Sequence, residues 1–319
     1  MFISCDTLDD VLLDLYPALL ERSKGTVIAT RGETAEIIGV LIEIKQPRAR
    51  LSRSETRGKL YSSLGELVWY LSRGNCLDFI EKYVSRYREE SEDGVEVYGG
   101  YGPRLFGQRG NDQVRNVIEL LRGRPTSRRA VIQIFNAEDI AAIHTEIPCT
   151  TTFQFFVRNE YLDMVTTMRS NDAYLGLLPH DVFCFTMLQE IIARSLGRDI
   201  GTYRHFAGSL HLYKDRWIDA QHFVDEAYQQ RIAMPEMPDD DPWPAIDIVL
   251  KAEDRIRNGE QIDAGSLGLA DYWSDLIRII QIYFAAGDTK KIEDLAGAIS
   301  FRGYRPYIIG RLRAVREDG

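Results

Sequence analysis

Cysteine is scarce in this sequence of 319 residues, and the few cysteines show no metal-binding pattern. Cys5, Cys76, Cys149 and Cys184 are scattered, without the CxxC pairs or Cys/His spacing of a zinc site. We therefore expect free thiols and no metal. Cys5, Cys76 and Cys184 are expected to be small buried hydrophobic residues, whereas Cys149 has a distinctive sequence context.

Long apolar runs and an excess of basic residues are also missing. No apolar stretch approaches the roughly 20 residues that cross a bilayer, and the acidic start MFISCDTLDD lacks the basic region of a signal peptide. The net charge of −9 argues against a nucleic-acid polymer as partner. A few focused arginines can still bind a small anion. We expect a cytoplasmic protein that contacts neither membrane nor nucleic acid.

Helical and strand patterns alternate up to the proline-rich, acidic stretch MPEMPDDDPWP, which begins at Met234. The strand patterns lie at 34–44, 128–136, 151–159, 161–168 and 201–213, and the helical patterns at 6–22, 58–75, 112–123 and 181–197. Beyond the stretch, helical periodicity dominates. We predict an α/β (α+β) domain over residues 1–233, then a linker and a helical C-terminal extension over 234–319 that packs on the same domain.

Cys149 lies in the segment IPCTTTFQF, where it follows a proline and opens an apolar strand. A thiol in that place can be held rigidly at a sheet edge, and it needs a nearby positive charge to become a reactive thiolate. Arg169, at the end of the next strand, is the candidate for that charge. A Pro-Cys pair alone is weak support, so the neighbouring motifs matter.

The segment RSNDAYLGLLPHDVFCF, residues 169–185, gathers an arginine, a serine and acidic or amide side chains where a strand ends. Arginine and serine suit a phosphate group, and Gly176 permits a tight backbone. The simpler interpretation is a helix N-cap with a surface salt bridge.

Together these motifs resemble the thymidylate synthase family. The matching segments, in family order, are RGETAE, GELVWYLSRGN, YGGYGPRLFG, SRRAVIQIFN, PCT…QF, RSNDxxLG and HLY, over roughly residues 25–215. The resemblance implies a thymidylate-synthase-type mixed β-sheet flanked by helices. It also implies an enzyme that transfers a one-carbon unit to a pyrimidine nucleoside monophosphate, with 5,10-methylenetetrahydrofolate as co-substrate.

The resemblance implies a role for each matching residue. Cys149 would attack C6 of the pyrimidine. The residues for the 5′-phosphate would be Arg31, Arg169 and Ser170, with Arg128 and Arg129 reaching the phosphate of the neighbouring subunit, which requires a homodimer. The others would be His211 and Tyr213 for the sugar 3′-hydroxyl, Glu66 for water and proton relay, Tyr101 for the polar network around C5, and Asp172 and Gly176 for the folate.

These residue types suit the chemistry. Thiolate addition at C6 turns C5 into a nucleophilic carbon that attacks the one-carbon unit of the folate. A base then removes the C5 proton, and elimination of tetrahydrofolate leaves an exocyclic methylene. Hydride from the folate gives a methyl product, whereas water gives a hydroxymethyl product.

Asp181 departs from the family pattern, which has asparagine at this place after the proline. The asparagine amide matches uracil, whereas a carboxyl group can accept from the 4-amino group of cytosine and share a proton with N3. Aspartate here is similar to the cytidylate 5-hydroxymethylase branch. Two alternatives stay open. Asp181 could N-cap the following helix. Alternatively, His180 could face the pyrimidine, because the segment LGLLPHD has one extra residue relative to the family pattern.

Three further features bear on the product and the sugar. Thr150 replaces the histidine that usually follows the nucleophile. The family's apolar C-terminal end is missing, which favours water over hydride, and ISFRGYRPYIIG, residues 299–310, is interpreted as a remnant of the family's last strand. The small Ala173 could leave room for a ribose 2′-hydroxyl, or could reflect close strand packing.

We therefore expect hydroxymethylation of CMP, slightly ahead of dCMP. The alternatives are a thymidylate synthase that methylates dUMP and a non-catalytic nucleotide-binding protein on this fold.

Overall fold

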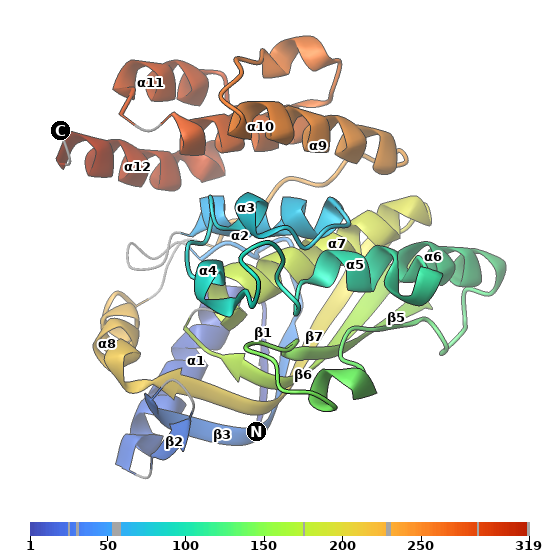
Figure 1. Ribbon diagram of the computed structural model, residues 1–319, viewed down its shortest axis with the longest axis vertical. Coiled ribbons are helices and arrows are strands. Elements are labelled where there is room, and N and C mark those ends of the chain that lie inside the picture. Colours follow the sequence, from blue (N-terminus) through green and yellow to red (C-terminus); the bar gives the residue numbers. More distant parts are fainter. Residues whose placement is uncertain are drawn as a thin grey trace.

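A seven-stranded mixed sheet forms one layer of the protein, with the strand order β1-β3-β7-β6-β5-β4 and β2 paired to β3 (Figure 1). The computed structural model describes residues 1–24, 26–29, 32–52, 59–174, 176–227, 231–285 and 287–317. The β1–β3 and β6–β7 pairs are parallel, and the other pairs are antiparallel. The strands are β1 Phe2–Cys5, β2 Val27–Ala29, β3 Gly32–Ile44, β4 Val131–Gln133, β5 Thr150–Arg158, β6 Tyr161–Asp172 and β7 Asp199–Tyr213.

The two faces of the sheet differ because side chains alternate along each strand. On β7, Tyr203, His205 and Ala207 are fully buried, whereas Arg204 and Phe206 point to the other face. That other face carries apolar side chains that remain exposed, including Ile38 on β3 and Val131 on β4. The buried face therefore holds the core, and the second face is only partly polar.

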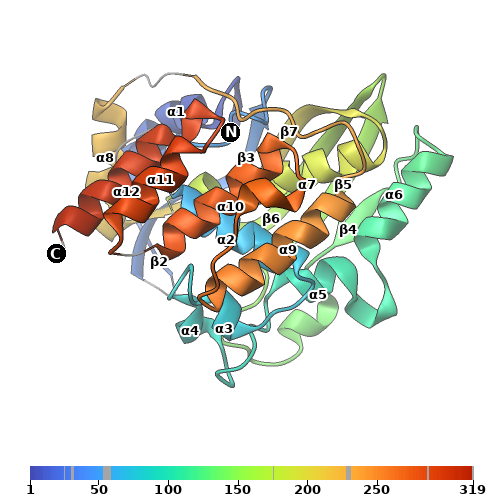
Figure 2. The same cartoon turned by 90° about the horizontal axis from the view of Figure 1, so that it is seen from above.

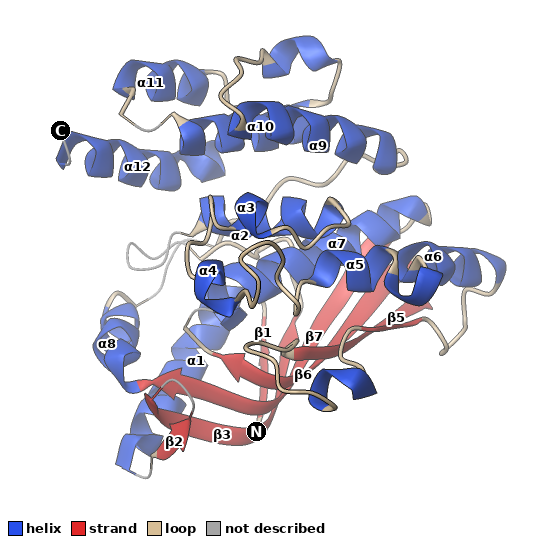
Figure 3. Ribbon diagram, viewed as in Figure 1, coloured by secondary structure: helices blue, strands red, loops and turns tan. Residues whose placement is uncertain are grey.

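Helices cover the buried face of the sheet (Figure 3). The longer ones in the body are α1 Leu8–Glu21, α2 Leu60–Leu71, α6 Gln113–Gly123, α7 Val182–Ser195 and α8 Trp217–Asp225, with the shorter α3 Leu77–Ile80, α4 Tyr87–Glu90 and α5 Tyr101–Phe106. Every described residue from Val182 to Arg194 of α7 is buried, so this helix runs through the core. The mixed α/β class predicted from the sequence is confirmed.

The C-terminal helices form a further layer above α2, on the side away from the sheet (Figures 1 and 2). They are α9 Trp243–Arg257, α10 Asp271–Phe284, α11 Thr289–Gly297 and α12 Arg305–Glu317. None of the helices in the described part of the chain is long and apolar enough to cross a membrane.

The interpretation of residues 299–310 as a strand remnant is wrong. The segment forms a short 3-10 turn, Arg302–Tyr304, and then the start of α12. Tyr304, Tyr307 and Ile308 are all buried, and their spacing of three and four residues is the spacing of one helix face. Pro306 in the first turn is compatible with a helix start.

Apolar side chains join the C-terminal layer to α2 and α7. Leu64, Leu67 and Val68 of α2 line a small apolar gap of about 10 Å³ together with Ile246 of α9 and Leu276 of α10. Such dense apolar contact is what holds helices together in a domain core. The extension is thus packed against the helix that carries Glu66.

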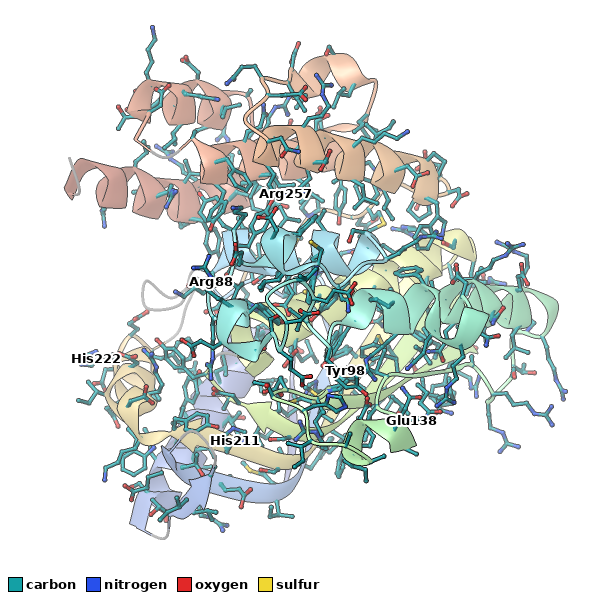
Figure 4. The ribbon with its side chains drawn as sticks, viewed as in Figure 1. Arg88, Tyr98, Glu138, His211, His222 and Arg257 are labelled. Carbon is teal, nitrogen blue, oxygen red and sulfur yellow. The ribbon has the colours of Figure 1, made fainter. Side chains whose placement is uncertain are left out.

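Polar contacts hold the same junction. The Tyr83 hydroxyl donates to Glu253 of α9 at 2.8 Å, and the Arg257 guanidinium lies 4.5 Å above the Phe79 ring. Figure 4 shows Arg257 between the C-terminal layer and the body. In the linker, the Met237 amide donates to the buried Glu190 carboxylate. The chain after the body is therefore fixed to it at several points.

Candidate active site

Cys149 lies just before β5, partly buried, and Arg169 of β6 is its immediate neighbour. The Arg169 amide donates to the Cys149 carbonyl at 2.8 Å, and its guanidinium donates to the carbonyls of Pro148 and Ile147, each at 2.9 Å. Burial raises the pKa of the Cys149 thiol to about 12, and the charge of Arg169 acts in the opposite direction. Arg169 is thus close enough for its charge to act on the thiol, but the effect of burial is larger.

Tyr101, the first residue of α5, fixes the backbone next to the thiol. Its hydroxyl donates to the Thr150 hydroxyl at 2.9 Å and accepts from the Thr150 amide at 3.2 Å. Its ring stacks on Tyr70 at 5.0 Å between centroids. Thr150, which replaces the family's histidine, therefore serves as the anchor for Tyr101.

Glu66 is buried on α2 and accepts hydrogen bonds on both of its oxygens. Tyr70 and Tyr87 donate to Oε1 at 2.7 and 2.6 Å, and the His180 imidazole contacts Oε2 through Nδ1. Burial alone would raise the pKa of Glu66, but His180 and the two phenols lower it below its usual value. The carboxylate is therefore ionised although it is surrounded by protein.

Asp181 occupies the N-cap position of α7, yet its side chain makes no capping hydrogen bond. The carboxyl group instead accepts from the Asn171 amide at 2.7 Å. The alternative that Asp181 acts as a helix cap is thus wrong. Burial raises its pKa to about 7, the charge of Glu66 acts in the same direction, and Asn171 opposes both. Both protonation states are populated near neutral pH.

Buried polar side chains extend the hydrogen-bond network of Asp181 beyond Asn171. His205 lies 3.0 Å from the side-chain oxygen Oδ1 of Asn171 through Nε2 and 2.8 Å from the Tyr203 hydroxyl through Nδ1. Burial lowers the pKa of His205 to about 3, so the ring is neutral. If Tyr203 donates to Nδ1, then Nε2–H donates to Asn171, which turns its amide nitrogen toward Asp181.

Sequence reasoning missed Asn171 and His205 as parts of the site. The available signal was strand alternation, which places His205 on the buried face of β7. Asn171 is buried on the neighbouring strand β6, and Asp172 is half-buried. A buried histidine on an apolar face needs hydrogen-bond partners, and the structure shows which partners it has.

The residues expected around the phosphate and sugar lie on neighbouring strands. Ser170 of β6 is half-buried and pairs in register with Ser209 of β7. His211 and Tyr213 follow on β7, with their rings edge to face at 5.1 Å, and Figure 4 shows His211 on the sheet. Arg31 lies outside the described residues.

Ala173 is fully buried, and its backbone is held on both sides. Its amide donates to the His211 carbonyl at 2.8 Å, and its carbonyl accepts from the Tyr16 hydroxyl at 3.2 Å. This geometry favours close packing, rather than space for a 2′-hydroxyl, as the reason for a small residue.

Asp172 and Gly176, the residues expected on the folate side, flank the end of β6. Asp172 accepts from the Tyr174 amide at 2.8 Å. Gly176 opens a π-helical turn, Gly176–Asp181, and a Cβ atom there would lie 2.8 Å from both the Asn171 amide and the Asp181 carboxylate. A larger residue at this position would have to displace the hydrogen-bonded side chains of Asn171 and Asp181.

Arg128 and Arg129 are exposed in the turn between α6 and β4. The Arg128 carbonyl accepts from Gln154 of β5 at 2.9 Å, and the Ala130 carbonyl accepts from Phe155. At about 3.4 Å per residue, this part of β5 lies roughly 20 Å along the strand from Cys149. Within one chain, these arginines are remote from the thiol.

The other cysteines are free thiols with different surroundings. Cys184 is buried and Cys5 half-buried, but Cys76 is exposed at the start of α3. The expectation of a buried Cys76 is wrong, because its strand-like bridge to Glu96 lies at the surface. Within the described ranges, no cluster of three His, Cys, Asp or Glu side chains is arranged to hold a metal.

Comparison with known proteins gives a family and several relatives. The thymidylate synthase family model matches residues 31–256. A deoxyuridylate hydroxymethyltransferase of Bacillus phage SP01 is 32% identical over 217 residues, 63% of this chain and 57% of that protein. The deoxyuridylate hydroxymethyltransferase of Pseudomonas phage M6 is 31% identical over 154 residues, 48% of this chain and 44% of that protein. That of Delftia phage PhiW-14 is 28% identical over 196 residues, 57% of this chain and 54% of that protein.

The chain thus spans about half the length of the curated relatives it matches. The family match agrees with the fold and with the predicted class of a one-carbon transferase. It covers the segments that contribute Glu66, Cys149 and Asp181. The chain belongs to the thymidylate synthase family.

Proposed function

We propose that this protein is a pyrimidine nucleoside monophosphate 5-hydroxymethyltransferase that uses 5,10-methylenetetrahydrofolate as co-substrate. The observation that carries the proposal is the placement of Asp181. Its buried carboxyl group accepts a hydrogen bond from Asn171. Its charge raises the pKa of the Cys149 thiol, and the charge of Glu66 raises the pKa of Asp181 itself. The proposed nucleophile and the carboxyl group proposed to recognise the pyrimidine thus lie close together.

The proposed reaction begins with the Cys149 sulfur, which forms a bond to C6 of the pyrimidine. The C5–C6 electron pair then attacks the one-carbon unit of the folate. Loss of the C5 proton and of tetrahydrofolate leaves an exocyclic methylene. Water adds to this carbon, the C6–S bond breaks, and the hydroxymethyl nucleotide leaves. The names of the phage relatives support water over hydride in the final step.

Cytosine is our first candidate for the base. A neutral Asp181 can donate its proton to N3 of cytosine, and its second oxygen can accept from the 4-amino group. The raised pKa, about 7, supports this assignment because it provides the neutral form at physiological pH. CMP and dCMP are both included, since the full burial of Ala173 supports no preference for ribose.

Uracil is the second candidate, because the three phage relatives are deoxyuridylate enzymes by name. An ionised Asp181 would accept from N3–H of uracil. The Asn171 amide, which already donates one hydrogen to Asp181, has a second hydrogen for O4. The two side chains together would then replace the single asparagine of the family pattern.

The decisive experiment is an assay with methylenetetrahydrofolate and each of CMP, dCMP, UMP and dUMP. We expect a 5-hydroxymethylcytosine nucleotide by mass spectrometry, without the absorbance of dihydrofolate, which forms only if hydride is transferred. A 5-hydroxymethyluracil nucleotide would select the second candidate. A methylated product with dihydrofolate would identify a thymidylate synthase, and nucleotide binding without turnover would indicate a binding protein.

We further propose a homodimer in which Arg128 and Arg129 bind the phosphate in the neighbouring subunit. Both side chains are exposed and remote from Cys149 of their own chain. The uncovered face of the sheet offers a contact surface, since Ile38 is 70% and Phe206 36% exposed there. Apolar side chains in the middle of a sheet face are typical of a surface that is covered in an assembly.

Subunit mixing tests the shared site. We expect Cys149→Ser and Arg128→Ala/Arg129→Ala proteins to be inactive separately. Random exchange between them should restore about a quarter of the wild-type sites, because half of the dimers are mixed and each mixed dimer has one complete site. The readout is product formation after exchange. Continued inactivity of the mixture, or full activity of the arginine variant alone, would contradict the shared site.

A further inference from the structure

The π-helical turn before α7 brings His180 into contact with Glu66 of α2. The turn, Gly176–Asp181, accommodates the extra residue of LGLLPHD, and π-type turns often occur at functional positions. His180 is the next-to-last residue of this turn. Its Nδ1 contacts the Glu66 carboxylate, and its Nε2 lies 3.1 Å from the Ser62 hydroxyl.

The partners of Glu66 determine which nitrogen of His180 carries a proton. Burial raises the pKa of Tyr70 and Tyr87 well above the usual value, so both phenols remain donors to Oε1. An ionised carboxylate can only accept, so Nδ1 of His180 donates to Oε2. In the neutral ring, the lone pair is then on Nε2.

Ser62 can satisfy Nε2 in either charge state of the ring. Its hydroxyl lies 3.1 Å from Nε2 and 3.2 Å from the Lys59 carbonyl. With a neutral imidazole, Ser62 donates to Nε2. With an imidazolium, Nε2–H donates to Ser62, which turns its own hydrogen to Lys59. The Ser62 hydroxyl can therefore pair with Nε2 either as donor or as acceptor.

Glu66 itself is less suited to accept a proton from water. Its side chain is 5% exposed and both oxygens are engaged, whereas the side chain of His180 is 18% exposed. His180 is also close enough to Asp181 for its charge to affect that carboxyl group, and Asp181 in turn affects Cys149. The imidazole is thus more accessible than the Glu66 carboxylate and lies close to Asp181.

We propose that His180 is the general base for the water that adds to the exocyclic methylene, and that Glu66 orients the ring and stabilises its positive charge. This inference rests on the hydroxymethyltransferase function proposed above. The arrangement of carboxylate, imidazole and a group to be deprotonated follows the same logic as a catalytic dyad or triad.

The step is balanced without an oxidant or reductant. The water oxygen forms a bond to the exocyclic carbon, and the electron pair of the exocyclic double bond moves into the ring as an enolate or its nitrogen equivalent. The Ser62 hydroxyl takes the proton from the water as it gives its own proton to Nε2 of His180. The pair then returns to form C5=C6, the C6–S bond breaks, and His180 gives its proton to the departing Cys149 thiolate.

The test separates water addition from the earlier steps. With a nucleotide tritiated at C5, tritium release reports loss of the C5 proton, and hydroxymethyl nucleotide reports water addition. For His180→Gln, we expect product formation to fall by about 10²- to 10⁴-fold, with little change in either KM. Tritium release should continue, and an added thiol should be found attached to the trapped methylene by mass spectrometry.

Controls keep a folding effect apart from a chemical one. His222→Gln, on α8, changes a histidine outside the site and should match wild type. Imidazole added to His180→Ala should restore product formation in part. Equal loss of tritium release and product, or no loss of either, would overturn the role of His180. Failure of wild type to make any hydroxymethyl nucleotide would instead overturn the proposed function, and this inference with it.

Discussion

The Cys149→Ser protein is expected to bind nucleotide with unchanged affinity and to lose turnover by on the order of 10⁴-fold or more. A serine hydroxyl has nearly the same size as the thiol, but it is a much weaker nucleophile and its proton is far harder to remove. The charge of Arg169 favours the thiolate of Cys149, but the effect of burial opposes it and is larger. The measurements are product formation at saturating substrates and nucleotide binding by calorimetry.

The matched control for this change is Cys76→Ser, because Cys76 is exposed and lies at the surface end of α3. It should retain wild-type turnover. If Cys149→Ser retained more than a few per cent of activity, covalent catalysis by this residue would be excluded. If it lost nucleotide binding as well, the serine would have disturbed the site and the result would count against a purely chemical role.

The Asp181→Asn protein is expected to change its base preference from cytosine toward uracil by about 10²- to 10⁴-fold in the ratio of kcat/KM values. Aspartate and asparagine side chains have nearly the same shape, so the substitution should leave the packing around this buried position unchanged. The amide cannot give a proton to N3 of cytosine, but it can accept from N3–H of uracil and donate to O4. Competition assays with CMP or dCMP against UMP or dUMP measure the ratio.

A pH series with wild type tests the same assignment. The pKa of Asp181 is raised to about 7, so its neutral form is lost as the pH rises through that value. We expect the ratio of kcat/KM for the cytosine nucleotide to kcat/KM for the uracil nucleotide to fall above pH 7, by about tenfold per unit, because ionisation of the Cys149 thiol affects both substrates equally. The Asp181→Asn protein should lack this decline. A base preference unchanged by both pH and substitution would mean that Asp181 does not read the base.

Local sequence motifs indicate candidate residues for the site, but they do not predict most of the contacts between these residues. The adjacency of Cys149 and Arg169 could be predicted, because both lie where consecutive strands pair. The contacts of Asp181 could not, because a residue that precedes a helix is usually explained by capping. The side-chain contacts in the structure show that Asp181 does not cap the helix and accepts from Asn171 instead.

The parts of the fold that escaped prediction depend on long-range contacts. His180 meets Glu66 across 114 residues of sequence, and no local pattern links a π turn to the middle of α2. Residues 299–310 contain aromatic and β-branched side chains that favour a strand, yet burial against other helices decides their structure. Cys76 is exposed because it bridges Glu96 at the surface, just before α3 begins.

The packing of α2 links the evolution of the C-terminal layer to that of the active site. One side of this helix holds Glu66, and the other contacts Leu276 of α10 and Ile246 of α9. A bulkier side chain at either contact would displace the helix as a rigid unit and change where the Glu66 carboxylate meets His180. Selection on the chemistry is therefore expected to constrain the inner faces of α9 and α10, while their outer faces can diverge freely.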